Sequence, residues 1–182
     1  MSKALVLLAV GAEEMEAVIA IDVLRRCGVE VTAAAIGVTR EVTASRGVRL
    51  LADAQLDEVI AEAFDVLVLP GGAGGARRLA ADARVLELAR QYARAGKLVA
   101  AVCAAPLVLE AAGLLRSVRF TCHPAVRDQF PSRQVSTERV VEDGNFITSQ
   151  GPGTSMEFAL SIARRLVDDA VAQKVAEGLI LP

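Results

Sequence analysis

The hydrophobic positions of this chain form short continuous runs that alternate with longer amphipathic stretches. The runs predict buried strands at Ala4–Ala9, Glu30–Ala35, Val66–Leu69, Leu98–Val102 and Phe146–Ser149. Apolar residues at helical spacing predict helices at Glu13–Cys27, Ala76–Ala95, Pro106–Leu115 and Ser155–Val167. Apolar strands separated by helices are typical of a mostly parallel sheet that helices cover on both faces. The pattern therefore predicts an α/β fold, a flavodoxin-like three-layer α/β/α sandwich, as one domain over residues 1–182.

Less regular segments lie between these elements. Val42-Thr43 and Val48–Leu51 predict a small hairpin, and Val118–Thr121 and Val135–Val141 predict short strands ahead of a turn at residues 142–145. In such sheets a ligand binds beyond the carboxyl ends of the strands. Three residues lie at or just after the ends of predicted strands, so we expect them at one edge of the sheet: Gly11, Gly71 and Cys103.

Composition narrows the class of protein. Hydrophobic residues make up 53% of the 182 residues, which excludes disorder, and the formal net charge is -2. Neither that charge nor the 3% of aromatic residues favours sequence-specific nucleic acid or an anionic membrane as a partner. The first apolar run is short and is followed by acidic residues, so it predicts a buried strand rather than a signal or membrane segment. Three cysteines without a CxxC motif fit a reducing cytoplasm.

The segment Ala101–Pro106 holds the most informative residue, Cys103. An apolar strand that ends on a cysteine and passes through small residues into a helix predicts a nucleophile elbow with sulfur as the nucleophile. The N-terminus of the following helix should favour the thiolate, so we expect the pKa of Cys103 to lie below its ordinary value. The alternative is an ordinary buried cysteine at the end of a core strand.

Glu16 is the second candidate. It shares a helix face with Ile19, Ala20 and Val23, which predicts a carboxyl that points into the protein. Burial would raise its pKa and keep it protonated near neutrality. The alternative is a solvated residue in the first turn of the helix.

The glycine-rich segment Leu69–Gly75 and the single histidine complete the candidates. Glycine lets backbone N–H groups approach a ligand, so the segment predicts an oxyanion-binding loop, with a simple helix-entry turn as the alternative. A cysteine nucleophile often uses a histidine as base, but the spacing leaves open whether His123 reaches Cys103. One histidine and no complete dinucleotide or phosphate-loop motif predict that no metal and no organic cofactor is bound.

These motifs occur together and in order, and the set resembles the ThiJ/PfpI superfamily, in the branch of the Parkinson-disease protein deglycase and bacterial YajL. The residues that carry the resemblance are Gly11–Glu16, Ser45–Val48, Leu69–Gly72, Ala101–Pro106, His123-Pro124 and Thr148–Thr154. The resemblance covers essentially the whole chain. One departure is Ala104, which stands where superfamily members with protease activity carry histidine, and it argues against a protease.

The resemblance implies a flavodoxin-like homodimer with Cys103 as nucleophile and Glu16, protonated, as the hydrogen-bond partner of its thiolate. His123 matches a pocket histidine and is the third expected catalytic residue. The expected oxyanion- and substrate-binding residues are Gly71, Gly72, Ala104 and Pro152.

The function that the resemblance implies is a cofactor-independent, cysteine-dependent glyoxalase or deglycase. Its expected partners are small reactive aldehydes such as methylglyoxal, or glycated protein and nucleotide adducts, and its products are 2-hydroxy acids. The alternative is a redox-responsive chaperone or oxidative-stress protein that is switched by oxidation of Cys103 to the sulfinic acid.

Overall fold

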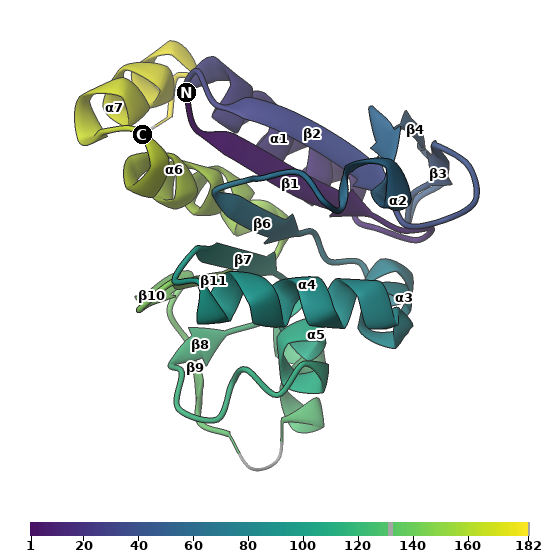
Figure 1. The fold of residues 1–182 in the computed structure, drawn as a ribbon. Coiled ribbons are helices and arrows are strands. Elements are labelled where there is room, and N and C mark those ends of the chain that lie inside the picture. The colour runs from purple at the N-terminus through teal and green to yellow at the C-terminus, as the bar shows by residue number, and fades with distance from the viewer. Residues whose placement is uncertain (131–132, 182) are drawn as a thin grey trace.

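The structure is a computed structural model that describes residues 1–130 and 133–181. Its centre is a seven-stranded sheet in the order β10-β11-β7-β6-β1-β2-β5 (Figure 1). The strands are β1 (Lys3–Leu8), β2 (Glu30–Ala35), β5 (Ala54–Gln55), β6 (Val66–Leu69), β7 (Leu98–Val102), β10 (Val140–Asp143) and β11 (Phe146–Ser149). All neighbours pair in parallel except β10, which is antiparallel to β11. The predicted mostly parallel sheet is confirmed.

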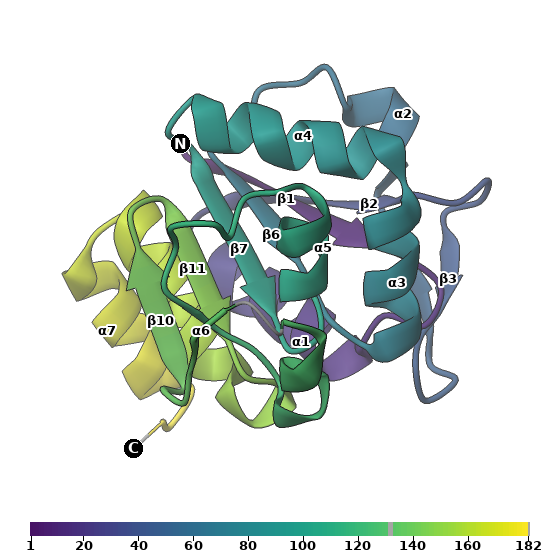
Figure 2. The same cartoon turned by 90° about the horizontal axis from the view of Figure 1, so that it is seen from below.

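Helices cover both faces of this sheet (Figures 1 and 2). One face carries α2 (Leu56–Val59), α3 (Ala73–Ala81), α4 (Ala83–Arg94) and α5 (Pro106–Ala111). The other face carries α1 (Glu14–Arg26), α6 (Ser155–Leu166) and α7 (Asp169–Gly178). Alternate residues of each strand point to opposite faces, so β1 gives Leu5 and Leu7 to one core and Val6 and Leu8 to the other. The three-layer α/β/α sandwich predicted from the sequence is confirmed.

Two small sheets lie outside the central one. The predicted hairpin is present as β3 (Glu41–Thr43) and β4 (Arg49–Leu51). The second small sheet is a parallel pair of β8 (Phe120–Thr121) and β9 (Val135–Ser136). His123 lies two residues after the end of β8 and caps the 3-10 helix η1 (Pro124–Gln129). A second 3-10 helix, η2 (Pro152–Thr154), precedes α6.

Several predicted boundaries are wrong. The predicted helix Ala76–Ala95 is two helices, because the Asp82 side chain accepts the N–H of Arg84 and starts α4 anew. The predicted strand Val135–Val141 is divided between β9 and β10, and β10 continues to Asp143. The pattern did not predict β5, α2 or α7. The first two are only two and four residues long, too short for a hydrophobic period to appear.

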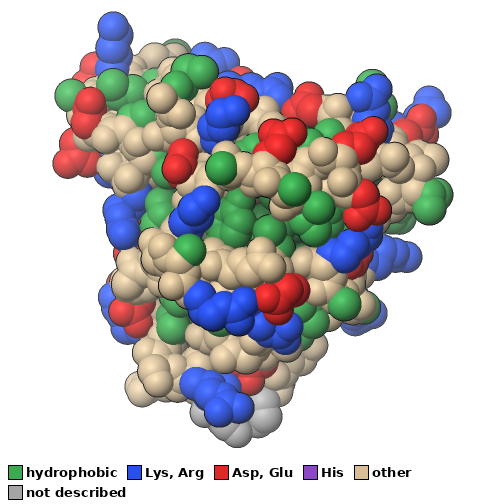
Figure 3. Space-filling view, in the orientation of Figure 1, with side chains coloured by type: hydrophobic (Ala, Val, Ile, Leu, Met, Phe, Trp, Pro, Cys, Tyr) green, Lys and Arg blue, Asp and Glu red, His purple; other side chains and the backbone are tan. Residues whose placement is uncertain are grey.

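Charged side chains of both signs are interspersed on the face of the molecule that Figure 3 shows, around a central group of apolar side chains. Within the described residues, no helix has the length and apolar character needed to cross a membrane.

Candidate active site

Cys103 lies immediately after β7 in a strained backbone conformation. Its φ is +64°, a region that non-glycine residues rarely occupy, and in the described chain only Ile180 shares a positive φ among such residues. Hydrogen bonds hold the residue on both sides: its N–H donates to the carbonyl of Ser149 (2.9 Å), and its carbonyl accepts the N–H of His123 (2.9 Å). The small neighbours Ala104 and Ala105 leave room for the turn. This is the geometry expected of a nucleophile elbow, and such strain is concentrated at functional sites.

The glycine-rich loop after β6 packs directly on this elbow. A Cβ on Gly71 would lie 2.6 Å from the Cβ of Cys103 and 2.7 Å from Oε2 of Glu16. Gly72 has a φ of +80°, and a Cβ there would collide with the carbonyl of Gly11. Only glycine therefore fits at these two positions, and the three strand ends that carry Gly11, Gly71 and Cys103 meet at one edge of the sheet as predicted.

Glu16 lies on α1, which covers one face of the sheet, and its side chain extends to the edge where Gly71 and Cys103 meet. Its side chain is fully buried, and Oε2 accepts the N–H of Gly71 at 2.7 Å. Burial raises the pKa of Glu16 to about 7, although hydrogen bonds with Cys103 and Gly71 oppose the shift. Among the described residues, Oε1 has no hydrogen-bond partner. The predicted inward, high-pKa carboxyl is confirmed, and it lies beside Cys103.

The expectation of a lowered thiol pKa at Cys103 is wrong. Burial and the negative charge of Glu16 raise the pKa of Cys103 to about 12, against the backbone N–H groups of Gly72 and Ala104, which donate to the sulfur and lower it. The helix that was expected to favour the thiolate, α5, is only six residues long. The sequence pattern showed the helix N-terminus but not the carboxylate that opposes it.

The acid and the thiol are therefore one titrating unit. Whichever group loses its proton first raises the pKa of the other through its negative charge. The pair loses one proton near pH 7 and keeps the second to high pH. Cys103 is then a thiolate when the remaining proton is on Glu16.

His123 joins the site through its backbone and its ring. Besides the N–H donated to Cys103, its Nδ1 accepts the N–H of Ala125 at 3.1 Å. Its ring lies near Gly151, since a Cβ there would be 3.3 Å from Cδ2 of the imidazole. Pro152 follows in η2, and its proposed contact with substrate remains a prediction.

The backbone N–H groups that were predicted to bind an oxyanion already have acceptors within the protein. The N–H of Gly71 is donated to Glu16, whereas those of Gly72 and Ala104 are directed at the sulfur of Cys103. The backbone donors that act on the sulfur are thus those of Gly72 and Ala104.

Sequence reasoning missed the role of Ser45. Its hydroxyl lies 2.7 Å from Oε2 of Glu13 and 2.8 Å from Oε2 of Glu14, and the N–H of Arg46 donates to Glu14 at 2.9 Å. These contacts fasten the turn of the β3–β4 hairpin to the start of the helix that carries Glu16. The only signal in the sequence was the motif Ser45–Val48.

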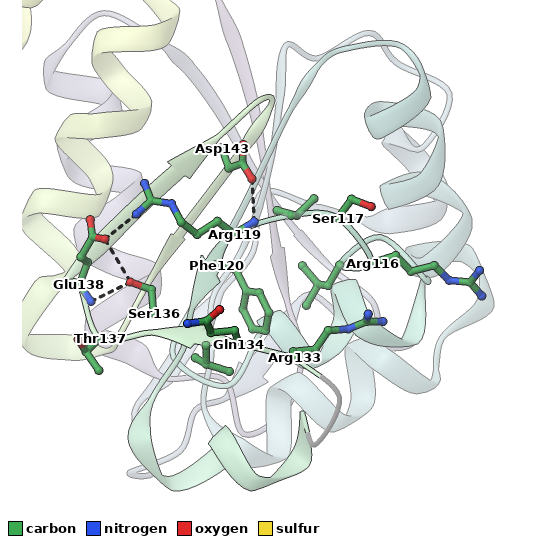
Figure 4. Close-up of a pocket in the computed structure, with 13 residues that line it drawn as sticks. Arg116, Ser117, Arg119, Phe120, Arg133, Gln134, Ser136, Thr137, Glu138 and Asp143 are labelled. Carbon is green, nitrogen blue, oxygen red and sulfur yellow. Dashed lines mark hydrogen bonds and ion pairs between the residues drawn. The ribbon is translucent and has the colours of Figure 1, made fainter.

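The cavity drawn in Figure 4 lies elsewhere. Its volume is about 730 Å³, and it lies between residues 115–120 and 133–138. Arg119 bridges to Glu138 on its wall and donates its backbone N–H to Asp143. None of the predicted site residues lines this cavity. Within residues 1–130 and 133–181, no group of three or more His, Cys, Asp or Glu side chains is arranged to hold a metal ion.

The fold and the elbow together define a class of protein: a doubly wound α/β domain with a cysteine at the end of a central strand and a buried glutamic acid beside it. Residues 2–165 match the model of the DJ-1/PfpI family, and the chain belongs to this family. It is 46% identical to Protein dj-1beta of Drosophila melanogaster, over all of this chain and 98% of that protein.

Solved structures agree with this assignment. The crystal structure of Drosophila melanogaster DJ-1beta superposes with a TM-score of 0.97 at 45% identity, with both chains fully covered. A structure described as "Toxoplasma gondii DJ-1, oxidized" gives 0.96 at 38% identity, over all of this chain and 99% of that one. The Caenorhabditis elegans protein named glutathione-independent glyoxalase DJR-1.2 is 38% identical over 85% of this chain and 83% of its own length.

Proposed function

We propose that this protein is a cofactor-independent glyoxalase or deglycase that acts on methylglyoxal-type 2-oxoaldehydes and their early adducts. The observation that carries the proposal is the buried Glu16 carboxyl beside Cys103 at the elbow, where a Cβ on Gly71 would lie 2.6 Å from the Cβ of Cys103 and 2.7 Å from Oε2 of Glu16. Burial raises the pKa of Glu16 to about 7. A nucleophile and an acid–base group with a pKa near the working pH are what an internal proton transfer requires. The relative named glutathione-independent glyoxalase supports the substrate class.

The reaction begins when the Cys103 thiolate adds to the aldehyde carbon, while Glu16 holds the proton. The new C–S bond leaves an alkoxide, which the N–H groups of Gly72 and Ala104 stabilise and which takes a proton to give a hemithioacetal. Glu16 as carboxylate then removes the proton from the former aldehyde carbon and returns it to the neighbouring carbon through an enediol. The result is a 2-hydroxy thioester. Water cleaves the C–S bond, releasing a 2-hydroxy acid (lactate from methylglyoxal) and the free thiol.

The test is steady-state turnover of methylglyoxal with lactate as the measured product. Cys103→Ala should abolish turnover, because it removes the nucleophile. Glu16→Gln should reduce kcat by 100-fold or more, because an amide can donate a hydrogen bond but cannot relay a proton. The matched control is Cys27→Ala, since Cys27 is a buried cysteine at the end of α1. Lactate formation that survives Cys103→Ala would refute the proposal.

We also propose that no metal or organic cofactor takes part. Prolonged dialysis against a chelator should leave the lactate rate unchanged. A loss of rate that an added metal ion restores would contradict this.

A redox-responsive chaperone is the alternative function, and the cradle around the sulfur supports it. N–H groups of Gly72 and Ala104 that donate to a thiolate can also donate to the oxygens of a sulfinate, and a relative has been solved in an oxidised form. Suppression of aggregation should then increase with peroxide treatment of the native protein and not of Cys103→Ala. Suppression that is the same in both proteins would exclude Cys103 as the switch.

A homodimer is the proposed assembly. Large apolar side chains are exposed on the outer face of α1 (Met15 54%, Val18 48%) and on the adjoining hairpin (Val48 48%, Leu51 73%). Exposed apolar side chains of this kind favour a protein–protein interface. Val18→Asp should shift the sedimentation coefficient from that of a dimer to that of a monomer.

A further inference from the structure

Two backbone hydrogen bonds hold Cys103 in its positive-φ conformation. Its N–H donates to the carbonyl of Ser149, and its carbonyl accepts the N–H of His123, both at 2.9 Å. A φ of +64° is unfavourable for a residue with a side chain, and it persists only where the surrounding structure fixes it. The position of the sulfur therefore depends on what holds Ser149 and His123 in place.

A hydrogen bond between two buried hydroxyl groups fixes Ser149. The pairing of β11 with β7 ends at this residue, opposite Val102. The Ser149 hydroxyl lies 2.9 Å from the carbonyl of Arg139 and 2.6 Å from Oγ1 of Thr154. Two hydroxyl oxygens at 2.6 Å repel each other unless a hydrogen lies between them, so Ser149 and Thr154 are hydrogen-bonded, whichever of them donates. Both side chains are buried, and the carbonyl that holds Cys103 thus depends on Thr154.

The same Thr154 hydroxyl fixes the segment that packs on His123. Its Oγ1 accepts the N–H of Gly151 at 3.1 Å, and the N–H of Thr154 donates to the Gly151 carbonyl at 3.0 Å. Gly151 in turn lies against the imidazole, since a Cβ there would be 3.3 Å from Cδ2 of His123. Thr154 therefore supports both residues whose backbone holds the elbow: Ser149 by a direct hydrogen bond and His123 through Gly151.

The hydroxyl of Thr154 is not used to start the helix that follows. Thr154 is the N-cap of α6, a position where a threonine hydroxyl ordinarily accepts a backbone N–H of the first helical turn. Within residues 133–181, its side chain makes no such bond with α6. It points back to Ser149 and Gly151 instead, so a role in capping α6 does not account for it.

We propose that Thr154 is a positioning residue for Cys103, and that its hydroxyl acts through Ser149 and Gly151 to keep the nucleophile elbow in its strained conformation. The inference rests on the proposed function only in taking Cys103 as the reactive group. Without the hydroxyl, the backbone of Cys103 can relax towards a negative φ, which is the favoured region for a residue with a side chain. That change moves the sulfur away from the N–H groups of Gly72 and Ala104, which stabilise its thiolate.

Two substitutions of Thr154 separate its hydroxyl from the shape of its side chain. Thr154→Val removes the hydroxyl and keeps the branched shape, whereas Thr154→Ser keeps the hydroxyl. The readout is the rate at which iodoacetamide alkylates Cys103 near neutral pH, with peptide mass spectrometry to assign the site. Thr154→Val should react about ten-fold more slowly than the native protein, the effect expected from losing one hydrogen bond, and Thr154→Ser within about two-fold of it. A native rate in Thr154→Val, or an equal loss in Thr154→Ser, would overturn the inference.

Val29→Ala is the control for a loss of stability alone. Val29 is buried just before β2, at the edge of the sheet opposite to the elbow, and its truncation leaves a cavity in the core. This variant should be alkylated within about two-fold of the native rate. If it reacts as slowly as Thr154→Val, the slow reaction follows from stability, and Thr154 has no positioning role.

Ser149→Ala removes the other hydroxyl of the pair and decides the case if Thr154→Val does not fold. It should slow alkylation as much as Thr154→Val does, and the double variant should be no slower than either single one, because both changes break the same contact. A native rate in Ser149→Ala, or additive losses in the double variant, would contradict the inference.

Turnover of methylglyoxal gives a second readout. Thr154→Val should lower kcat about ten-fold and leave KM within about two-fold of the native value, because the nucleophile is displaced while substrate binding is kept. A raised KM with an unchanged kcat would place Thr154 in substrate binding and overturn the inference. If the native protein forms no lactate, the proposed function fails, and the alkylation rates still decide the role of Thr154.

Discussion

Glu16 should make the stability of this protein decrease as pH rises towards neutrality. Burial raises its pKa from 4.5 to about 7. Because the folded state binds this proton more tightly than the unfolded chain, the stabilisation is fully present below pH 4.5 and is lost as pH rises through 7. A shift of this size is worth about 3.5 kcal/mol in total, since one pKa unit corresponds to roughly 1.4 kcal/mol. Of this, about 2.5 kcal/mol falls between pH 5 and pH 8.

The perturbation is Glu16→Gln, which keeps an oxygen to accept the Gly71 N–H and cannot ionise. The free energy of unfolding should be measured by denaturant titration at pH 5 and at pH 8. Between these values the native protein should lose about 2.5 kcal/mol more stability than the variant. The titrating groups outside the pair of Glu16 and Cys103 are common to both proteins and cancel in this difference.

Glu62→Gln is the control, because this glutamate is exposed. It should follow the pH dependence of the native protein. Equal pH dependence in the native protein and Glu16→Gln would refute the raised pKa and, with it, the role of Glu16 as acid and base.

Two further results are expected. Gly71→Ala should lower the free energy of unfolding by about 1–3 kcal/mol and slow alkylation of Cys103, because the new methyl group would lie within 2.6–2.8 Å of atoms of Glu16, Val102 and Cys103. Gly178→Ala is the control, because a Cβ at Gly178 meets nothing within 4 Å, and equal melting temperatures of the two variants would contradict the packing argument. Mild peroxide should oxidise Cys103 before Cys27 or Cys122, since Cys103 is partly accessible and the other two are buried. Peptide mass spectrometry that finds Cys27 or Cys122 oxidised first would refute this.

The strand ends show how far the sequence could predict the site. Continuous apolar runs before Gly11, Gly71 and Cys103 identify parallel strands, and parallel strands place their carboxyl ends at one edge. Glu16 could be predicted as well, because helical spacing puts it on the apolar face of α1. These inferences need only the spacing of the apolar residues and the common direction of the parallel strands.

The pKa of Cys103 could not be predicted in this way. It depends on how deeply the sulfur is buried and on which charge lies beside it, and both follow from packing between segments 87 residues apart in the chain, at Glu16 and Cys103. The contact of Ser45 with Glu13 and Glu14 could not be predicted for the same reason. It forms only when the β3–β4 hairpin, which has no strong hydrophobic pattern, folds back onto the start of α1. Short elements and contacts between distant segments are what a local pattern cannot encode.

The reactivity of the sulfur is set by competition for one proton. The N–H of Gly71 donates to Glu16 and stabilises its carboxylate, whereas the N–H groups of Gly72 and Ala104 donate to Cys103 and stabilise its thiolate. Consecutive glycines of one loop thus act on opposite members of the pair. The shared proton is either on Glu16, with Cys103 as thiolate, or on Cys103, with Glu16 as carboxylate. A ligand oxygen that accepts the N–H groups of Gly72 and Ala104 removes the stabilisation of the thiolate and so changes which of the two groups holds the proton. In the reaction we propose, addition of the thiolate to an aldehyde is the step that does this: the new alkoxide takes over those donors, and Glu16 is left ready to exchange its proton with the substrate.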